Sequence, residues 1–348
     1  MSLPHYQPRN ILVTGGAGFI GANFIRYLLT QDPAVAIFNL DALTYAGSLK
    51  NLDQLPHPER HTFIQGDICD AKLVSDSLQR YHIDTIIHFA AESHVDRSIQ
   101  GPAPFIQTNV VGTFTLLEAA RQYWQLQQQW GTHQCRFHHV STDEVYGALA
   151  AKDAAFTEQT SYAPHSPYSA SKAGSDHLVR AYFHTYRLPI TISNCSNNYG
   201  PYQHPEKLIP TIIRACQTQQ AIPIYGDGSN IRDWLYVEDH CRGIEMIVKQ
   251  AKIGETYNIG GHQELSNLEV ARSICDLMDV MFPQSKPHQT LIQFVPDRPG
   301  HDWRYAINCQ KITQDFNWLP QQTFKEGLKK TVLFYLYRMV REVIDSSE

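Results

Sequence analysis

Two residues one helical turn apart could carry out proton transfer to and from an alcohol. Tyr168 and Lys172 belong to the segment Tyr-Ser-Ala-Ser-Lys at the predicted start of a helix, so their side chains share one face. Lowering the pKa of a phenol from ~10 by about three units requires roughly 4 kcal/mol of preferential stabilisation. An adjacent ammonium and a positive nicotinamide ring would supply it in a desolvated site. The alternative is a tyrosine and a lysine on a helix surface.

A pair of neighbouring carboxylates follows an apolar run. Asp143 and Glu144 end the polar segment Ser-Thr-Asp-Glu at 141–144. In a cleft such carboxylates repel each other, so the pKa of at least one rises and the pair separates into a proton donor and a proton acceptor. A reaction that removes one proton and delivers another needs that difference. The alternative is that Asp143 caps a turn and Glu144 is solvated.

A glycine-rich turn predicts where a dinucleotide binds. The strand-like residues 11–14 run into Gly15, Gly18 and Gly21, and a helical apolar pattern follows. These glycines would permit the sharp turn, the approach to a pyrophosphate and close helix packing, respectively. Asp41 lies about twenty residues beyond Gly21, where a carboxylate accepts ribose hydroxyls and repels a 2′-phosphate. The pattern therefore favours NAD over NADP.

The elements that must position these residues alternate between strands and helices. This alternation predicts a Rossmann-type α/β fold, a doubly wound parallel sheet, with a smaller α/β substrate lobe after it. Long helices are expected over 108–128 and 168–186, and an amphipathic helix over 324–344. The predicted strands are 11–14, 35–40, 61–65, 84–90, 135–141 and 189–195.

Ligands of such sheets bind at the carboxyl ends of the strands, where two loops besides the segment 141–144 are informative. Asp67 and Ile68 offer a polar and an apolar contact for adenine. Ala90 and Ala91 allow close backbone approach, and Ser93 offers a hydroxyl. Each loop taken singly is also compatible with ordinary loop chemistry.

Composition excludes several classes of function. The chain has 348 residues, of which 43% are hydrophobic and 18% charged, and a net charge of −5. These values indicate a globular protein of two domains, or of one large domain with a substantial lobe, without a nucleic-acid footprint. Without an apolar run long enough to span a membrane or a signal peptide, we expect a cytoplasmic protein. Seven scattered cysteines indicate reduced thiols, and the 17 histidines show no metal-ligand spacing, so no metal is expected.

The chain resembles the dTDP-glucose 4,6-dehydratases, within the extended short-chain dehydrogenase/reductase family, along nearly its whole length. The Tyr/Lys pair marks the superfamily only, whereas the Asp-Glu pair is more discriminating, since related epimerases and decarboxylases lack one or both carboxylates. The matching segments are 14–21, 41–47, 66–68, 90–98, 141–147, 168–172, 197–201 and 297–301.

The resemblance implies a mechanism with NAD as cofactor and dTDP-glucose as substrate. Tyr168, as phenolate, would take the C4 hydroxyl proton while hydride leaves C4 for NAD. Glu144 would then remove the C5 proton as Asp143 protonates the departing C6 hydroxyl. Hydride would return to C6, giving the 4-keto-6-deoxy sugar. Thr142 would bind the C4 oxygen, and Lys172 would hold the nicotinamide ribose and lower the Tyr168 pKa.

The resemblance also implies which residues bind the two ligands. Those expected to contact NAD are Gly15, Gly18, Phe19, Ile20, Gly21, Asp41, Ala42, Leu43, Thr44, Asp67, Ile68, Ala90, Ala91, Thr108, Tyr168, Lys172 and Asn198. Those expected to contact the nucleotide sugar are Ser93, Thr142, Asn197, Lys207, Leu208, Pro223, Tyr225, Arg232, Asn267, Arg298 and His301, with the arginines on its diphosphate.

The domain division and the assembly are further expectations. The NAD-binding domain is expected over 8–195, with 230–258 returning to it, and the nucleotide-sugar-binding domain over 196–229 and 259–345. The helix 168–186 carries surplus apolar surface, which an intersubunit helix bundle or a buried core would use, and a homodimer is expected through the helices 108–128 and 168–186. The alternatives to the main function are a UDP-sugar 4,6-dehydratase, a UDP-sugar 4-epimerase, and a dinucleotide-sensing scaffold without catalysis.

Overall fold

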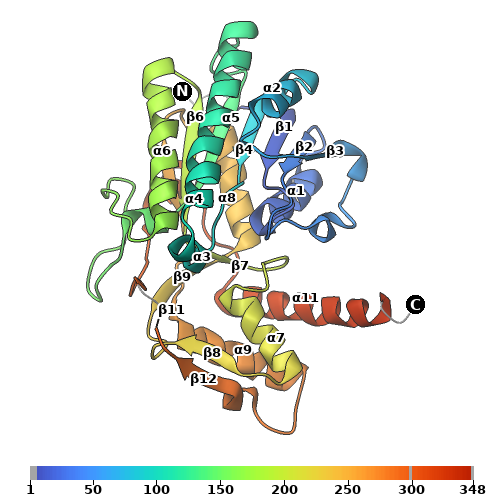
Figure 1. Ribbon diagram of the computed structural model, residues 1–348, viewed down its shortest axis with the longest axis vertical. Coiled ribbons are helices and arrows are strands. Elements are labelled where there is room, and N and C mark those ends of the chain that lie inside the picture. The colour runs from blue at the N-terminus through green and yellow to red at the C-terminus, as the bar shows by residue number, and fades with distance from the viewer. Residues whose placement is uncertain (1–5, 298–299, 346–348) are drawn as a thin grey trace.

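A seven-stranded sheet forms the larger part of the molecule. The computed structural model describes residues 6–297 and 300–345. All strands of this sheet are parallel, in the order β10-β6-β5-β4-β1-β2-β3, with helices on both faces (Figure 1). The predicted doubly wound, Rossmann-type fold is confirmed. The strands are β1 (Asn10–Thr14), β2 (Ala36–Asp41), β3 (His61–Gln65), β4 (Thr85–His88), β5 (Arg136–Thr142), β6 (Ile190–Cys195) and β10 (Thr256–Ile259).

Helix α6 carries the predicted Tyr/Lys pair, and local sequence fixes its start. It spans Pro167–Tyr186 and begins with a capping box in which the Ser166 side chain accepts from the Ser169 N–H and the Ser169 side chain binds back. Pro167 occupies the first turn, where its missing N–H costs nothing. The helix therefore begins directly before Tyr168.

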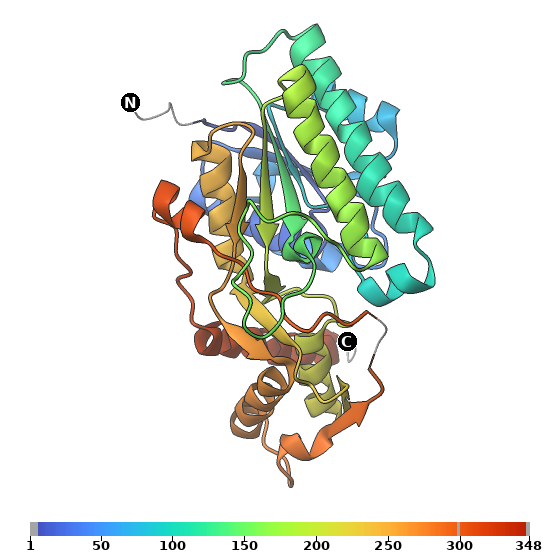
Figure 2. The ribbon, with the colours of Figure 1, turned by 90° about the vertical axis from the view of Figure 1, so that its left-hand side faces the viewer.

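The helical run beside α6 starts earlier than predicted. It is continuous from 103 to 127 and consists of α4 (Ala103–Phe105), the π-helical η3 (Ile106–Gly112), α5 (Thr113–Ala120) and the π-helical η4 (Arg121–Gln127). The start predicted at 108 was wrong because Pro102 and Pro104 are tolerated in a first helical turn. Figure 2 shows this run lying alongside α6.

The smaller lobe lies beyond the carboxyl ends of the sheet strands (Figure 1). It has a three-stranded sheet of order β11-β9-β7 and a two-stranded sheet of β12 and β8. Its strands are β7 (Asn197–Tyr199), β8 (Ile222–Tyr225), β9 (Ile231–Tyr236), β11 (Glu264–Ser266) and β12 (Ile292–Val295). Its helices are α7 (Leu208–Thr218), α9 (Asn267–Met281) and α11 (Phe324–Asp345).

The segment expected to return to the large domain does so only in part. Strand β10 pairs in parallel with β6, and α8 (Val237–Gln250) lies against α1 (Phe19–Gln31). Strand β9 instead pairs with β7 and β11. Sequence periodicity marks β9 as a strand but carries no information about its partners. The domain boundaries themselves stay a prediction.

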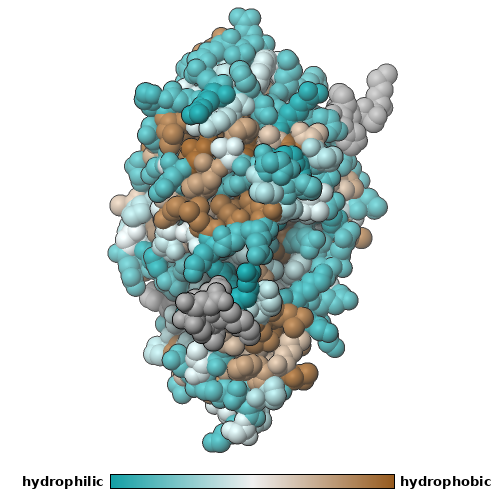
Figure 3. Space-filling view, turned by 90° about the vertical axis from the view of Figure 1, so that its right-hand side faces the viewer, coloured by the Kyte–Doolittle hydropathy of each residue, from teal (hydrophilic) through white to brown (hydrophobic). Residues whose placement is uncertain are grey.

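The remaining helices are short or cover one face of the sheet. Within 6–297 and 300–345, every helix is too short or too polar to cross a bilayer. Figure 3 shows one face of the molecule, on which hydrophilic side chains predominate and hydrophobic ones gather in separate areas. The remaining short helices are η1 (Leu49–Leu52), η2 (Pro58–Arg60), α2 (Ala71–Arg80), α3 (Val95–Gln100), η5 (Asp143–Tyr146), η6 (His288–Leu291) and α10 (Gln310–Phe316).

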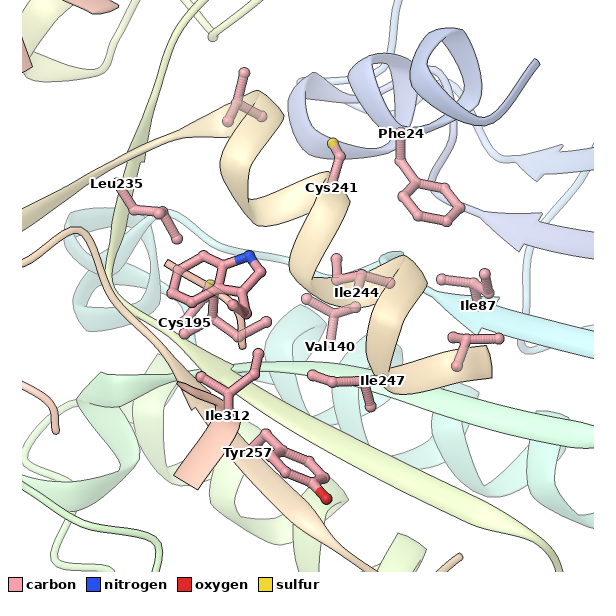
Figure 4. Close-up of a cluster of buried hydrophobic side chains, with 14 of the residues drawn as sticks. Phe24, Ile87, Val140, Cys195, Leu235, Cys241, Ile244, Ile247, Tyr257 and Ile312 are labelled. Atoms are coloured by element: carbon pink, nitrogen blue, oxygen red, sulfur yellow. The ribbon is translucent and has the colours of Figure 1, made fainter. Parts of the chain in front are cut away.

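Two hydrophobic cores, one on each face, hold the sheet rigid. Figure 4 shows the first, where Phe24 of α1 and Ile244 and Ile247 of α8 lie over Ile87 of the sheet. The second contains Trp124 and other side chains of the helices on the opposite face. Because cores are densely packed, the strand ends that carry the predicted site have fixed positions relative to one another.

Candidate functional site

A cavity of about 310 Å³ lies at the carboxyl ends of the strands, between the sheet and the smaller lobe. Its lining brings together most of the predicted residues, although they come from segments far apart in the chain. The predicted residues that line it are Gly15, Gly18, Phe19, Ile20, Gly21, Asp41, Ala42, Thr44, Asp67, Ile68, Ala90, Ala91, Ser93, Thr108, Thr142, Asp143, Glu144, Tyr168, Lys172, Asn197, Asn198 and Lys207.

The glycine turn leaves no room for side chains. Gly15 has φ +71°, and a Cβ there would lie 2.7 Å from the backbone of Ala90. A Cβ on Gly21 would lie 2.3 Å from the Gly15 carbonyl oxygen. Helix α1 begins after Gly18, and no side chain caps its N–H groups. The N–H groups at the start of α1 are therefore available to bind a phosphate, whereas those of Gly15, Ala17 and Gly18 are already hydrogen-bonded within the protein.

The crowding around Gly15 predicts that a side chain at this position destabilises the protein. Gly15→Ala combines a left-handed φ with a backbone collision, so we expect the free energy of unfolding to fall by about 2 kcal/mol. Urea denaturation measures this fall. Gly101→Ala is the matched control, because a Cβ at Gly101 meets nothing within 4 Å. Equal stability of the two variants would contradict the claim.

Asp41 is held in a fixed orientation at the end of β2. Its Oδ2 accepts the Ala17 N–H and its Oδ1 accepts the Leu43 N–H, each at 2.8 Å. Burial raises the pKa of Asp41, against the effect of these two hydrogen bonds. Leu43 does not line the cavity, and its backbone N–H orients Asp41, so its contact with NAD stays a prediction.

The carboxylate pair lies in a 3₁₀ turn at the end of β5. The Thr142 hydroxyl accepts the Glu144 N–H at 3.3 Å and lies 3.4 Å from Asp143 Oδ1, while Asp143 Oδ2 has no hydrogen-bond partner among the described residues. Burial, with the charges of Glu144 and Asp233, raises the pKa of Asp143 well above its ordinary value. Asp143 is therefore suited to donate a proton, the role that the family resemblance implies for it.

Tyr168 lies close to this pair. Burial raises the pKa of Tyr168 well above its ordinary value, and the charge of Glu144 raises it further, whereas a Thr142 hydrogen bond lowers it. The side chains of Tyr168, Thr142 and Glu144 thus act on one another across the cavity. The protein atoms alone keep Tyr168 as a neutral phenol.

Lys172 is held by a backbone carbonyl: its Nζ donates to the Val140 carbonyl at 2.9 Å. In the protein atoms alone, burial and the charge of Glu144 dominate the pKa of Tyr168. The lowering of that pKa by Lys172 together with a positive nicotinamide ring stays a prediction. Burial also lowers the pKa of Lys172.

Two segments of the smaller lobe complete the lining. Asn198 is fixed by contacts from its Oδ1 to His240 Nδ1 at 2.9 Å and from its Nδ2 to the Ser196 carbonyl at 3.0 Å. Lys207 Nζ donates to the Ser93 carbonyl at 3.2 Å, which joins the lobe to the loop after β4. The cavity therefore has walls from both parts of the molecule.

The remaining predicted substrate residues do not line this cavity. Pro223 and Tyr225 lie on β8, and the Tyr225 ring is 6.3 Å from that of His301. Leu208 packs on the core of the smaller lobe, and the Asn267 N–H donates to the Asn230 carbonyl. A ligand would have to extend beyond the cavity to reach them.

Arg232 lies nearer to the chemistry than these residues. It is buried, its guanidinium donates to the Asp302 carbonyl at 2.9 Å, and its charge acts on Asp143. Arg298 lies outside the described residues.

Several lining residues were not predicted. Tyr45, Glu92, Gln203 and His204 line the cavity. Tyr45 and Glu92 belong to segments that carry the family resemblance, which was the available signal, whereas no pattern in the sequence distinguishes Gln203 or His204. Among the described residues, no group of three or more potential ligands is placed to hold a metal ion.

Comparisons with known proteins extend the geometric argument. The sequence model of the family described as GDP-mannose 4,6 dehydratase matches residues 12–331. The chain is 54% identical over 336 residues to a dTDP-glucose 4,6-dehydratase of Shigella flexneri, covering 94% of this chain and 92% of that protein. It is also 54% identical over 338 residues to the enzyme of that name from Neisseria gonorrhoeae, covering 96% and 97%. The chain belongs to the dTDP-glucose 4,6-dehydratase family.

Solved structures of this dehydratase family have the same fold. A dTDP-glucose 4,6-dehydratase from Streptomyces venezuelae, solved with NAD and TYD bound, has a TM-score of 0.86 and 44% identity, covering 95% of this chain and 98% of that chain. A UDP-glucose 4-epimerase from Thermotoga maritima has a TM-score of 0.82 but only 25% identity, covering 95% and 99%. The epimerase alternative is therefore not favoured.

Proposed function

We propose that this chain converts dTDP-glucose to dTDP-4-keto-6-deoxyglucose with loss of water, using NAD. The observation that carries the proposal is the joint presence in one cavity of Tyr168, an Asp143 with a raised pKa, and Glu144. The names of the relatives, together with the NAD and TYD bound in one solved structure, support the choice of ligands.

The residues around the glycine turn fit a dinucleotide. The crowded turn at Gly15 has no room for a side chain, so its backbone can approach a pyrophosphate, and the oriented Asp41 carboxylate suits two ribose hydroxyls and repels a 2′-phosphate. Asp67, Ile68 and Thr108, which line the cavity, would hold the adenosine half. NAD, when bound, supplies a positive ring charge near Tyr168 and an acceptor and donor of hydride for the sugar.

The protein's part in the first half of the reaction is to remove the C4 hydroxyl proton. Tyr168 accepts this proton, and the Thr142 hydroxyl binds the C4 oxygen. Because burial and Glu144 hold Tyr168 neutral in the protein alone, its activation depends on positive charge in the cavity. Lys172, fixed by the Val140 carbonyl, contributes such a charge and holds a ribose.

The carboxylate pair performs the elimination. The C4 ketone acidifies the C5 hydrogen, which Glu144 removes as a proton. Asp143 gives its proton to the C6 hydroxyl, so that the C6–O bond breaks and water leaves. The raised pKa of Asp143 keeps this proton available at neutral pH.

The nucleotide half of the substrate would extend toward the smaller lobe. Ser93, Asn197 and Lys207 line the cavity nearest the sugar site, and Arg232 supplies a buried guanidinium for the diphosphate. Tyr225 and His301 would contact the base region.

A panel of nucleotide sugars tests the proposal. The protein is incubated with dTDP-, UDP-, CDP- and GDP-glucose, and the 4-keto product and any C4 epimer are followed by mass spectrometry and NMR. We expect 4-keto-6-deoxy product with dTDP-glucose at the highest kcat/KM. Faster turnover of UDP-glucose would favour a UDP-sugar dehydratase. Formation of a C4 epimer would favour a 4-epimerase. Binding without turnover would favour a dinucleotide-sensing scaffold. Asp143 argues against an epimerase, because epimerisation requires no acid to protonate a departing hydroxyl.

We also propose that the chain forms a homodimer through α6 and the adjacent helical run 103–127. The support is that Val111 and Phe114 are 37% and 46% exposed on that run. Small residues, Ala170 and Ala181, are exposed on α6 beside it, where a partner helix could approach closely. Two copies related by a twofold axis would cover both surfaces.

Light scattering after size-exclusion chromatography measures the assembly. We expect the wild type to elute as a dimer and Phe114→Asp as a monomer, because the charge would be buried without a partner. Val280→Asp is the control, since Val280 is 80% exposed on α9, far from the proposed interface. A dimeric Phe114→Asp variant would exclude this face.

Cytoplasmic location is a further proposal. All seven cysteines are free thiols, and six of them are buried. Thiols without disulfide partners fit a reducing compartment. The polar nucleotide-sugar substrate proposed above fits the same location.

A further inference from the structure

Three segments meet beside the cavity through contacts that have no role in the steps derived above. They are the loop after β2, the segment that runs from β4 into α3, and residues 203–207 of the smaller lobe. Tyr45, Ser93 and His204, one from each segment, line the cavity. Figure 1 shows α3 between the main sheet and the smaller lobe. The cavity therefore shares one wall among three parts of the chain.

Tyr45 joins the first two of these segments. Its hydroxyl lies 3.3 Å from the Ser93 hydroxyl, and the guanidinium carbon of Arg97 lies 4.3 Å from the centre of its ring. A cation at this distance over an aromatic face is attracted by the ring. In the sheet order β4-β1-β2, the strand between the two segments is β1. The contacts of Tyr45 with Ser93 and Arg97 therefore form a bridge across the end of β1, where the glycine turn begins at Gly15.

The smaller lobe holds both sides of this bridge. Arg97 Nη2 donates to Glu206 Oε1 at 2.6 Å, and His204 Nε2 lies 3.1 Å from the Tyr45 carbonyl oxygen. The Glu206 N–H donates to His204 Nδ1 at 3.4 Å, so Nε2 is the donor of a neutral imidazole. Burial lowers the pKa of His204, which agrees with the neutral form. Opening the bridge would therefore also separate it from the smaller lobe.

The ion pair between Arg97 and Glu206 does not act in isolation. The two side chains are 44% and 39% exposed, and an exposed pair of this kind contributes little by itself. Here the same guanidinium also lies over the Tyr45 ring, and Lys207 donates to the Ser93 carbonyl. Contacts that converge on the same few residues reinforce one another. Together they hold Tyr45 over the glycine turn.

We propose that Arg97 is a positioning residue that holds Tyr45 over the glycine turn, so that a bound dinucleotide leaves only when this bridge opens. The inference rests on the proposed function, in which NAD binds with its pyrophosphate at the turn. The reaction requires such retention, because the hydride taken from C4 has to return to C6 of the same sugar. Loss of the reduced cofactor in between would leave the sugar oxidised at C4 and unreduced at C6.

The rate at which NADH leaves the protein tests this role without any assay of turnover. The holoenzyme is loaded with NADH and mixed with a large excess of NAD, and the decay of NADH fluorescence gives the rate of release. We expect Arg97→Gln to release NADH about tenfold faster than the wild type, because the ion pair and the ring contact are both lost. A rate within about twofold of that of the wild type would overturn the proposal.

Arg121→Gln is the matched control. Arg121 also pairs with a glutamate, Glu118, at 2.6 Å, and its guanidinium carbon lies 4.9 Å from the centre of the Tyr186 ring. None of these three residues lines the cavity. The change should lower the melting temperature about as much as Arg97→Gln and leave the rate of NADH release unchanged. Equally faster release from both variants would assign the effect to a loosened fold and overturn the proposal.

A double variant tests whether Arg97 acts through Tyr45. Tyr45→Leu removes the ring on which the guanidinium lies, so adding Arg97→Gln to it should accelerate NADH release little further. Effects that multiply in the double variant would show that the two residues act independently, and Arg97 would not be a positioning residue. A wild type that binds no NADH would contradict the proposed function and the bridge together, and the wild-type measurement alone identifies that outcome.

Discussion

Replacing Tyr168 with phenylalanine is expected to lower kcat about 10³-fold, because the hydroxyl that accepts the C4 proton is lost while the rest of the site stays intact. The ring is buried and lies 6.4 Å from Phe105, edge to face, so phenylalanine fits the same space. On mixing with NAD and dTDP-glucose, neither absorbance at 340 nm nor 4-keto product should rise. Retention of NAD should match the wild type.

Tyr146→Phe is the control for this experiment. Tyr146 is also buried, its hydroxyl donates to Asn258 Oδ1 at 2.8 Å, and it does not line the cavity. Its loss should cost about 1 kcal/mol of stability and leave kcat near that of the wild type. A Tyr168→Phe variant that still forms NADH on addition of substrate would remove Tyr168 as the base.

The fold could be predicted because its signals are local. Alternating apolar runs and helices are sufficient to predict a parallel sheet, and the four-residue spacing of Tyr168 and Lys172 is sufficient to place both on one face of α6. Strand pairing outside the main sheet is not a local property. This is why β9 could be recognised as a strand while its pairing with β7 and β11 could not be predicted.

The site shows the same division between local and non-local information. Spacing and strand ends indicated which residues share the cavity, and the structure brings Tyr168, Asp143 and Glu144 together there. What each side chain contacts depends on residues distant in sequence, such as the Val140 carbonyl 32 positions before Lys172. The direction of the Tyr168 pKa shift also depended on burial, which no spacing reveals.

The second large effect concerns the two carboxylates, whose roles as acid and base the variants Asp143→Asn and Glu144→Gln should distinguish. Either change is expected to lower 4-keto-6-deoxy product formation by ~10²–10⁴-fold, because one lacks the acid and the other the base. In D₂O, Asp143→Asn should still exchange the C5 hydrogen of the bound sugar, since Glu144 remains. Glu144→Gln should not exchange it. NMR of the recovered substrate gives the extent of exchange, and both variants should retain NAD like the wild type.

The pH dependence of stability provides an independent check on Asp143. A carboxyl whose pKa is raised in the folded protein stabilises the fold below its unfolded pKa, near ~3.9, and loses that contribution as the pH rises through the folded pKa. The amide introduced by Asp143→Asn is neutral at every pH. The free energy of unfolding of this variant minus that of the wild type should therefore increase as the pH rises. The wild type should also lose kcat over the same rise in pH.

In the exchange experiment, the contrary outcome is that Asp143→Asn exchanges no C5 hydrogen while Glu144→Gln does. In that case the roles of acid and base would have to be reversed.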